Sequence, residues 1–135
     1  MDARRFMLAG NATFTIVSGK TGTRFTYKVR AKEVDGGSKT LHFVSVLTGA
    51  DNENDFAFLG TIFDGVRFRH SPKSRIGVDA PSAKAFAWAF GRILANSLGT
   101  DASVHHEGKC GRCGRKLTVP RSIEVGLGPE CENAG

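Results

Sequence analysis

Three cysteines are the residues of this 135-residue chain best suited to chemistry. Cys110 and Cys113 lie two residues apart in the segment KCGRCGRKL, and Cys131 follows near the end. One tight turn can aim two thiolates at a single ion across this spacing, and Gly114 follows where such turns often need positive φ. Thiolates are preferred zinc ligands, and structural zinc takes four ligands. We therefore predict a structural Zn²⁺ site that contains all three sulfur atoms.

The fourth zinc ligand must come from another residue type. His105 and His106 lie just upstream, and three residues separate His106 from Cys110, enough chain to fold back. We predict His106 as the fourth ligand, with His105 as the second choice and an external ligand as the third. A closed tetrahedral site leaves no position for a reacting water, so the predicted zinc is structural rather than catalytic.

Two other interpretations of the cysteines are weaker. A redox dithiol would sit at the start of a helix in a thioredoxin-like context, whereas glycines and cations surround this pair and no helical pattern follows. Inert core cysteines would not lie in so polar a segment. The basic neighbours of the pair can offset the negative charge of a metal site, so part of this charge has a structural role: Lys109, Arg112, Arg115 and Lys116.

Composition indicates one ordinary globular protein with a basic balance. Hydrophobic residues make up 40% and charged residues 24%, and the formal net charge is +6. The apolar runs are far shorter than the roughly 18 residues of a membrane span, and the first residues lack a signal-peptide core. We therefore expect a cytoplasmic protein without a membrane partner. The odd cysteine count and the expected reducing compartment disfavour disulfides.

The first half of the chain alternates like a set of β-strands. Residues 12–17 and 23–32 are separated by a Gly- and Ser-rich turn, which is typical of a hairpin. Three further segments have strand character and are bounded by turn residues or polar loops: 41–47, 56–63 and 66–70. This pattern predicts an antiparallel β-sheet.

Basic side chains recur at every second position of two of these strands. Because successive side chains point to opposite faces of a sheet, each strand would present its cations to one wet face. The residues concerned are Arg24, Lys28, Arg30 and Lys32 on one strand and Arg67 and Arg69 on another. Such a face could follow the phosphates of nucleic acid, although a merely solvated face is the plain alternative. No helix carries a set of side chains that would distinguish base edges.

A helix follows the strands. Ser82 is a plausible N-cap beside Pro81, and Gly99 could end the helix in the left-handed conformation. The helical spacing predicts that one stripe packs on the sheet, comprising Phe86, Phe90, Ile93 and Leu94. Trp88 lies off this stripe, so it should either cover a sheet edge or contact the metal module.

The tail should form a small module of its own. We expect a hairpin between Cys113 and Cys131, then a sharp turn at Gly126 and Gly128 and a short helix that begins at Pro129. The predicted fold is α+β: an antiparallel sheet packed on one helix in residues 1–100, followed by a treble-clef-like zinc module in residues 101–135.

The tail also resembles a known family. The segment HEGKCGRCGRKLTVPRSIEVGLGPEC is similar to the zinc-binding module of an uncharacterised family found in phages and bacteria, including actinobacteria. That module combines Cys-x-x-Cys-Gly-Arg, Leu-Thr-x-Pro-x-Ser and Gly-x-Gly-Pro-x-Cys. The matching positions are Cys110, Cys113, Gly114, Arg115, Leu117, Thr118, Pro120, Ser122, Gly126, Gly128, Pro129 and Cys131. The resemblance covers about the last 30 residues and implies zinc and a phage or mobile-element origin, but no activity.

Two binding functions remain open from the sequence. The first is nucleic-acid association through the basic sheet face, driven mainly by charge. The second is a protein-interaction module that inhibits or redirects a host protein, with the acidic loop Asp51–Asp55 and exposed aromatic residues as candidate contact points. We expect no small-molecule substrate and no catalysis. Adjacent histidines faintly suggest a His-Me finger nuclease, but the tail offers Asn133 and no further histidine.

Overall fold

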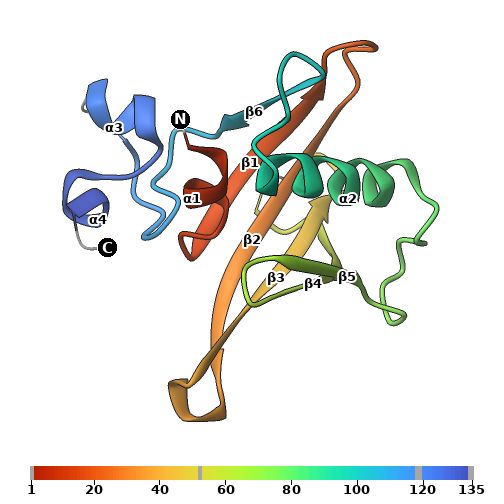
Figure 1. Ribbon diagram of the computed structural model, residues 1–135, viewed down its shortest axis with the longest axis horizontal. Helices are drawn as coiled ribbons and strands as arrows, with labels where there is room; N and C mark the ends of the chain where they lie inside the picture. Colours follow the sequence, from red (N-terminus) through yellow and green to blue (C-terminus); the bar gives the residue numbers. More distant parts are fainter. Residues whose placement is uncertain (1, 52, 118–119, 134–135) are drawn as a thin grey trace.

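The computed structural model describes residues 2–51, 53–117 and 120–133. Its main feature is a six-stranded antiparallel sheet, with helices at both ends of the chain (Figure 1). The strands are β1 (Asn11–Ser18), β2 (Arg24–Val34), β3 (Lys39–Leu47), β4 (Phe56–Phe63), β5 (Arg67–His70) and β6 (Ala102–His106). The helices are α1 (Ala3–Met7), α2 (Pro81–Leu94), α3 (Pro120–Val125) and α4 (Pro129–Asn133), and a short 3-10 turn, η1 (Asp35–Gly37), joins β2 to β3.

The sheet order is β5-β4-β3-β2-β1-β6. Strands β1 to β5 form a meander in which neighbours in the chain are neighbours in the sheet, as the sequence pattern predicts. Strand β6 follows α2 and pairs with the free edge of β1, with Phe14 opposite His106. This strand was not predicted from the sequence, because it is only five residues long and three of those residues are polar. Residues 102–106 of the predicted zinc module therefore belong to the sheet.

One face of the sheet carries the hydrophobic core. Helix α2 crosses this face (Figure 1), and Phe86 is its central side chain. The Phe86 ring lies 5.1 Å from Tyr27 and 4.8 Å from Phe68, measured between ring centroids. Tyr27 is fully buried and its hydroxyl donates to the Ser82 carbonyl at 2.7 Å, so β2 and α2 are joined by both packing and a hydrogen bond.

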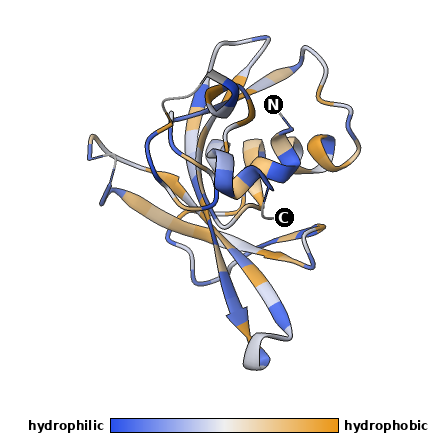
Figure 2. Cartoon of the chain, turned by 90° about the vertical axis from the view of Figure 1, so that its left-hand side faces the viewer, coloured by the Kyte–Doolittle hydropathy of each residue, from blue (hydrophilic) through white to orange (hydrophobic). Residues whose placement is uncertain are grey.

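Helix α1 adds to the same core, which corrects the prediction of a single packing helix. Phe6 and Met7 are buried in one cluster with Phe14 and Phe86. Because α1 is only five residues long, its stability must come from this burial rather than from helix propensity. The hydrophilic and hydrophobic stretches of the chain can be followed in Figure 2.

The ends of α2 differ from those predicted. Its N-cap is Ala80, without a side-chain cap, and Pro81 occupies the first turn, so Ser82 is not the cap. The helix ends at Leu94, and Asn96 takes the left-handed conformation with φ of 52°, ahead of Gly99. Asparagine tolerates this conformation because its side chain hydrogen-bonds locally. Four residues of this helix were predicted to be buried. Phe86, Phe90 and Ile93 are buried, and Leu94 is partly buried.

The tail contains a helix where we predicted a hairpin. After β6, the described residues of the tail contain an isolated bridge between Lys109 and Lys116, and the segment from Pro120 to Val125 is α3. Proline favours the first helical position, and Gly126, with φ of 77°, suits the residue after a helix end. The short helix predicted to begin at Pro129 is confirmed as α4.

Strand β4 contains an irregularity that decides which residues face solvent. Its register with β3 shifts between Val44 and Ser45, so that Leu59 is an extra residue. Leu59 and Gly60 are both buried, which reverses the alternation for the rest of the strand. Position 60 must be glycine, because a Cβ there would lie 2.3 Å from the Arg69 carbonyl oxygen.

No helix within the described part of the chain is long and apolar enough to cross a membrane.

Replacing Phe86 with alanine should lower the free energy of unfolding by about 3–5 kcal/mol, since it removes a fully buried ring and leaves a cavity. Lys84→Ala, at an exposed position of the same helix, should change it by less than about 0.5 kcal/mol. Urea unfolding followed by circular dichroism measures both. Equal stabilities of the two variants would contradict the assignment of Phe86 to the core.

Candidate functional site

The structure brings the three cysteines together. Their sulfur atoms all lie within 4.8 Å of one another, although Cys131 is far from the other two in the chain. Cys110 and Cys113 occupy a tight turn, in which the Gly114 N–H donates to the Cys110 carbonyl at 2.9 Å. Gly114 has φ of 78°, the left-handed conformation expected from its position. Cys131 comes from the first turn of α4.

Backbone donors favour ionisation of one of the three thiols. Burial raises the pKa of Cys110, but N–H groups of Cys113, Gly128 and Arg112 outweigh it and lower the pKa to about 7. The Arg112 N–H lies 3.4 Å from the Cys110 sulfur. Peptide donors around a thiolate of this kind are suited to a metal ligand, because they delocalise negative charge without competing for the ion.

The third thiol behaves in the opposite way. Burial, hydrogen bonding with Cys113 and Cys110, and the negative charge of these neighbours raise the pKa of Cys131 to about 11. Three thiolates this close repel one another, so full ionisation of the cluster requires a cation among them. A bound cation would therefore stabilise the ionised form of the three thiols, which repel one another without it.

The donor set fits zinc. A tetrahedral ion with Zn–S bonds of about 2.3 Å holds its sulfur ligands about 3.8 Å apart. The 4.8 Å limit on the sulfur separations requires only small side-chain adjustments to reach this value. A hollow of about 270 Å³ beside the sulfurs is also bordered by Ser122 and Glu130. Cys110, Cys113 and Cys131 thus form a group of three ligand atoms that could hold a metal ion.

Neither histidine is brought into this group of sulfurs. Because side chains alternate along β6, His105 and His106 point to opposite faces of the sheet. His105 lies on the face opposite the hydrophobic core and hydrogen-bonds with the Ser103 hydroxyl at 2.8 Å. His106 lies 5.7 Å from the Phe6 ring on the core side. The assignment of His106 as the fourth ligand stays a prediction.

The His106 ring makes two hydrogen bonds with the backbone of the tail. Its Nδ1 accepts from the Gly108 N–H at 2.9 Å, and its Nε2 donates to the carbonyl of Ile123 in α3. Both ring nitrogens therefore contact the backbone, and the side chain links the sheet edge to the tail. The sequence analysis missed this role because it did not predict β6 or α3.

Several contacts besides the sulfurs hold the tail in place. The Gly111 carbonyl accepts from the N–H of Asn11 in β1 at 2.7 Å, and the Gly111 N–H donates to the Gly126 carbonyl at 2.8 Å. A Cβ at position 111 would lie 2.7 Å from the Phe6 ring. The cysteine turn is thus fitted closely against β1 and α1, and Gly111, one of the two residues between the paired cysteines, is required for this packing.

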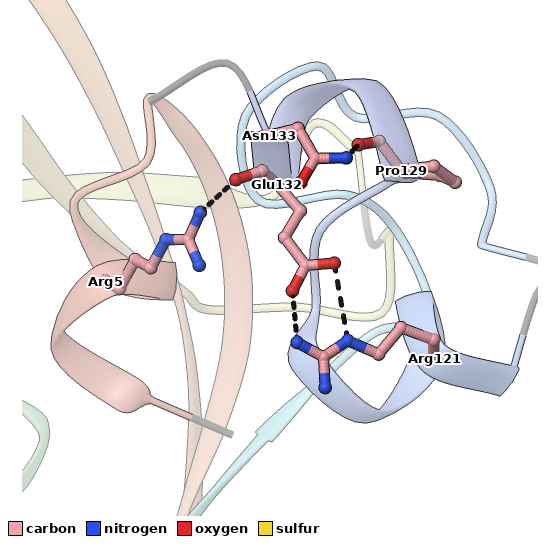
Figure 3. A network of polar contacts seen from close by, with 5 residues as sticks. All are labelled: Arg5, Arg121, Pro129, Glu132 and Asn133. Carbon is pink, nitrogen blue, oxygen red and sulfur yellow. Dashed lines mark hydrogen bonds and ion pairs between the residues drawn. The ribbon is translucent and has the colours of Figure 1, made fainter.

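Glu132 links three of the four helices (Figure 3). Its carboxylate accepts two hydrogen bonds from Arg121 of α3, the shorter at 2.6 Å, and its carbonyl accepts from Arg5 of α1. The hydrogen bonds from Arg121 hold the pKa of Glu132 below its usual value. Asn133 donates to the Pro129 carbonyl within α4, so the residue considered for a nuclease site has a structural contact.

A second candidate site is the sheet face opposite the core. Strand pairing places Arg30 opposite Phe43, Phe43 opposite Thr61 and Thr61 opposite Arg69. A parallel row runs from Lys32 through Leu41 and Phe63 to Arg67. We call this surface the open face; it carries all of the predicted basic residues, namely Arg24, Lys28, Arg30, Lys32, Arg67 and Arg69. None of these six is buried.

The aromatic residues of the open face were not identified individually from the sequence. Phe43, Phe56, Phe58 and Phe63 lie there, partly or largely exposed. The signal was present, because segments 41–47 and 56–63 are apolar at nearly every position. A strand with apolar residues on both faces must present some of them away from a core that covers one face only. The β4 irregularity hid the alternation that would have identified which ones.

The acidic loop beside the open face is internally bonded. The Asp51 carboxylate accepts from the N–H groups of Glu53 and Asn54 and from the Asn54 side chain, and these hydrogen bonds lower its pKa. Glu53 and Glu107 share a hollow of about 310 Å³ with Lys28 at the edge of this face. Asn52 lies outside the described residues.

Trp88 is partly exposed on α2. The Arg92 guanidinium lies 5.1 Å from the centre of its ring system, and the residue lines a hollow of about 530 Å³ with Phe25 and Ile16. Trp88 therefore lies beside the interior strands β1 and β2, and its expected position over a sheet edge stays a prediction.

Comparison with known proteins gives one match. Residues 100–133 are similar to a family described as a family of unknown function, DUF6011. The matched segment contains β6, the three cysteines and both C-terminal helices, so it coincides with the tail that the sequence motif defines. Thr118 of that motif lies outside the described residues. Neither the curated proteins nor the solved structures include a match to this chain.

Serine at Cys110 or Cys131 should abolish tight metal binding, because either change leaves two sulfurs in the cluster. Elemental analysis of protein purified without chelator should show zinc in the wild type and little in either variant. Addition of a strong chelator should lower the wild-type Tm by more than about 4 °C and leave the Tm of the variants unchanged. A metal-free wild type would overturn the assignment.

His106→Gln should lower the stability, since glutamine does not reproduce both backbone contacts of the imidazole. The expected loss is about 1–2 kcal/mol in the free energy of unfolding. His105→Gln, at the neighbouring exposed position, is the matched control. Loss of zinc from the His106 variant alone would instead identify this imidazole as the fourth ligand.

Proposed function

We propose that the protein binds nucleic acid through the open face of its sheet, with a structural zinc ion stabilising the tail. The observation that supports the first part is the strand register, which gathers six cations from two separated strands onto one surface that the helices leave free. Two neighbouring strands, β3 and β4, lie between the cationic ones. Cationic side chains therefore border both sides of a central strip that is uncharged from Leu41 to Leu47 of β3 and along β4.

Phosphates are the partner that this distribution suits. Cations at every second position of a strand recur at roughly 6–7 Å, a spacing close to that of phosphates along an extended nucleic-acid chain. Such contacts release counterions and carry no sequence information. Glu53 and Glu107 lie at the rim beside Lys28, so the strongest attraction should be at Arg30, Lys32 and the β5 arginines.

Zinc would act on stability rather than on chemistry. Cys110, Cys113 and Cys131 would hold the ion, which supplies a fixed crosslink between the cysteine turn and α4. These residues lie away from the open face, and the Asn11–Gly111 hydrogen bond connects the two regions through β1. The tail would then keep β1 and β6 in place at one edge of the binding sheet.

Binding to nucleic acid should weaken steeply with salt. For single-stranded DNA the slope of log K against log salt is about −0.7 per neutralised phosphate, so contacts from four to six cations give about −3 to −4. Fluorescence anisotropy with a labelled oligonucleotide between low and moderate salt measures this slope. Arg30→Gln combined with Arg69→Gln should reduce affinity and lower the magnitude of the slope by about 1–2.

The matched control removes the same charge elsewhere. Lys20 and Lys84 are exposed and border the hollow near Trp88, on the other side of the sheet. Their double change to glutamine should leave binding nearly unaltered. Equal losses in the two double variants would show that net charge, not the open face, is responsible. If neither DNA nor RNA binds at low salt, while a protein is captured from nuclease-treated lysate, nucleic acid is the wrong partner.

A further inference from the structure

Four phenylalanines form the centre of the open face. Phe43 on β3 and Phe58 on β4 meet edge to face, with ring centroids 6.0 Å apart. Phe56 and Phe63 lie farther along β4, on either side of this pair. Phe58 is 39% exposed, and the other three rings are partly exposed. Contiguous apolar side chains at a surface with a polar rim are typical of a binding site.

Cations accompany these rings at short range. The Lys28 ammonium lies 4.4 Å from the centre of the Phe56 ring, and the Arg67 guanidinium lies 5.4 Å from that of Phe63. Arg30 pairs with Phe43 across the β2–β3 ladder. Each of these three rings thus has a cation beside it, which places an aromatic surface and a phosphate-binding group within one nucleotide's reach.

The neighbours of Phe58 leave room above its ring. Strand pairing puts Ser45 opposite it, and Lys28 lies beyond Ser45 in the same row. A small hydroxyl next to this partly exposed ring lets a flat group approach the ring. The row then runs from a ring to a small polar side chain to a cation, which matches the order of base, sugar and phosphate in one nucleotide.

We infer that the open face binds single-stranded nucleic acid, with bases stacking on Phe58 and its neighbouring rings and phosphates held by the flanking cations. This inference rests on the proposed function and deepens it. In a duplex the base faces are hidden inside the stack, and only groove edges and phosphates are available. A row of phenylalanines would contribute little to duplex binding, whereas every unpaired base has a face that can stack on an aromatic ring.

The test compares single strands with a duplex and removes one ring at a time. Fluorescence anisotropy would use a labelled 20-nucleotide oligothymidine and a labelled 20-base-pair duplex at the same salt concentration. Wild type should bind the single strand at least about tenfold more tightly. Phe58→Ala should weaken single-strand binding on the order of 5- to 100-fold, the range for loss of one stacking partner, and change duplex binding less than about twofold.

Two further variants separate the loss of the ring from a loss of folding and from the loss of any exposed ring. Phe58→Leu retains an apolar side chain but removes the ring, so it should fold as the wild type does and still lose single-strand affinity. Trp88→Leu is the control, because Trp88 has a similar exposure of 43% but lies on α2 across the sheet. It should leave binding unchanged. Melting curves for all variants separate loss of fold from loss of contact.

The outcomes distinguish this inference from the proposed function. Equal affinity for the duplex and the single strand, with no effect of Phe58→Leu, would overturn base stacking and leave electrostatic binding intact. Absence of binding to either probe at low salt would overturn both. A single-strand affinity that falls with salt but is the same in Phe58→Leu and wild type would also contradict a role for the ring.

Discussion

The burial of one sheet face is the constraint on which the rest of the structure depends. Tyr27, Phe14 and Val29 point toward α2 and α1, and because side chains alternate, their neighbours on β1 and β2 must face the other way. A change of register by one residue would bury the β2 cations, at a large desolvation cost. The hydrophobic core therefore determines where the charges lie, and the open face needs no separate means of arrangement.

The tail depends on the same core through Phe6. This ring contacts Phe14 and His106, and Gly111 approaches it closely enough that no side chain fits at that position. The turn that carries Cys110 and Cys113 thus packs against α1 and β1. Hydrogen bonds from His106 and Arg5 to the two C-terminal helices add to this attachment, so contacts outside the sulfur cluster help to position the three cysteines.

Much of this arrangement could be predicted from the sequence. The five strands of the meander, the long helix, the convergence of the three cysteines and the short helix at Pro129 follow from periodicity and turn chemistry. Strand β6 and helix α1 could not be predicted in the same way, because each is only five residues long and is stabilised by contacts distant in sequence. The positions of the two histidines depend on β6, and therefore their surroundings were not foreseen either.

The extra residue in β4 has a consequence for how this surface tolerates change. Phe58 and Phe63 differ in parity, yet both face solvent because Leu59 and Gly60 occupy successive inward positions. Removal of Leu59 would restore regular alternation and leave Phe58 and Phe63 on the open face, because the pairs on either side of it already match a continuous ladder. The extra residue therefore adds a fully buried leucine to the core without moving the exposed rings, so its loss should cost the core more than it costs the surface.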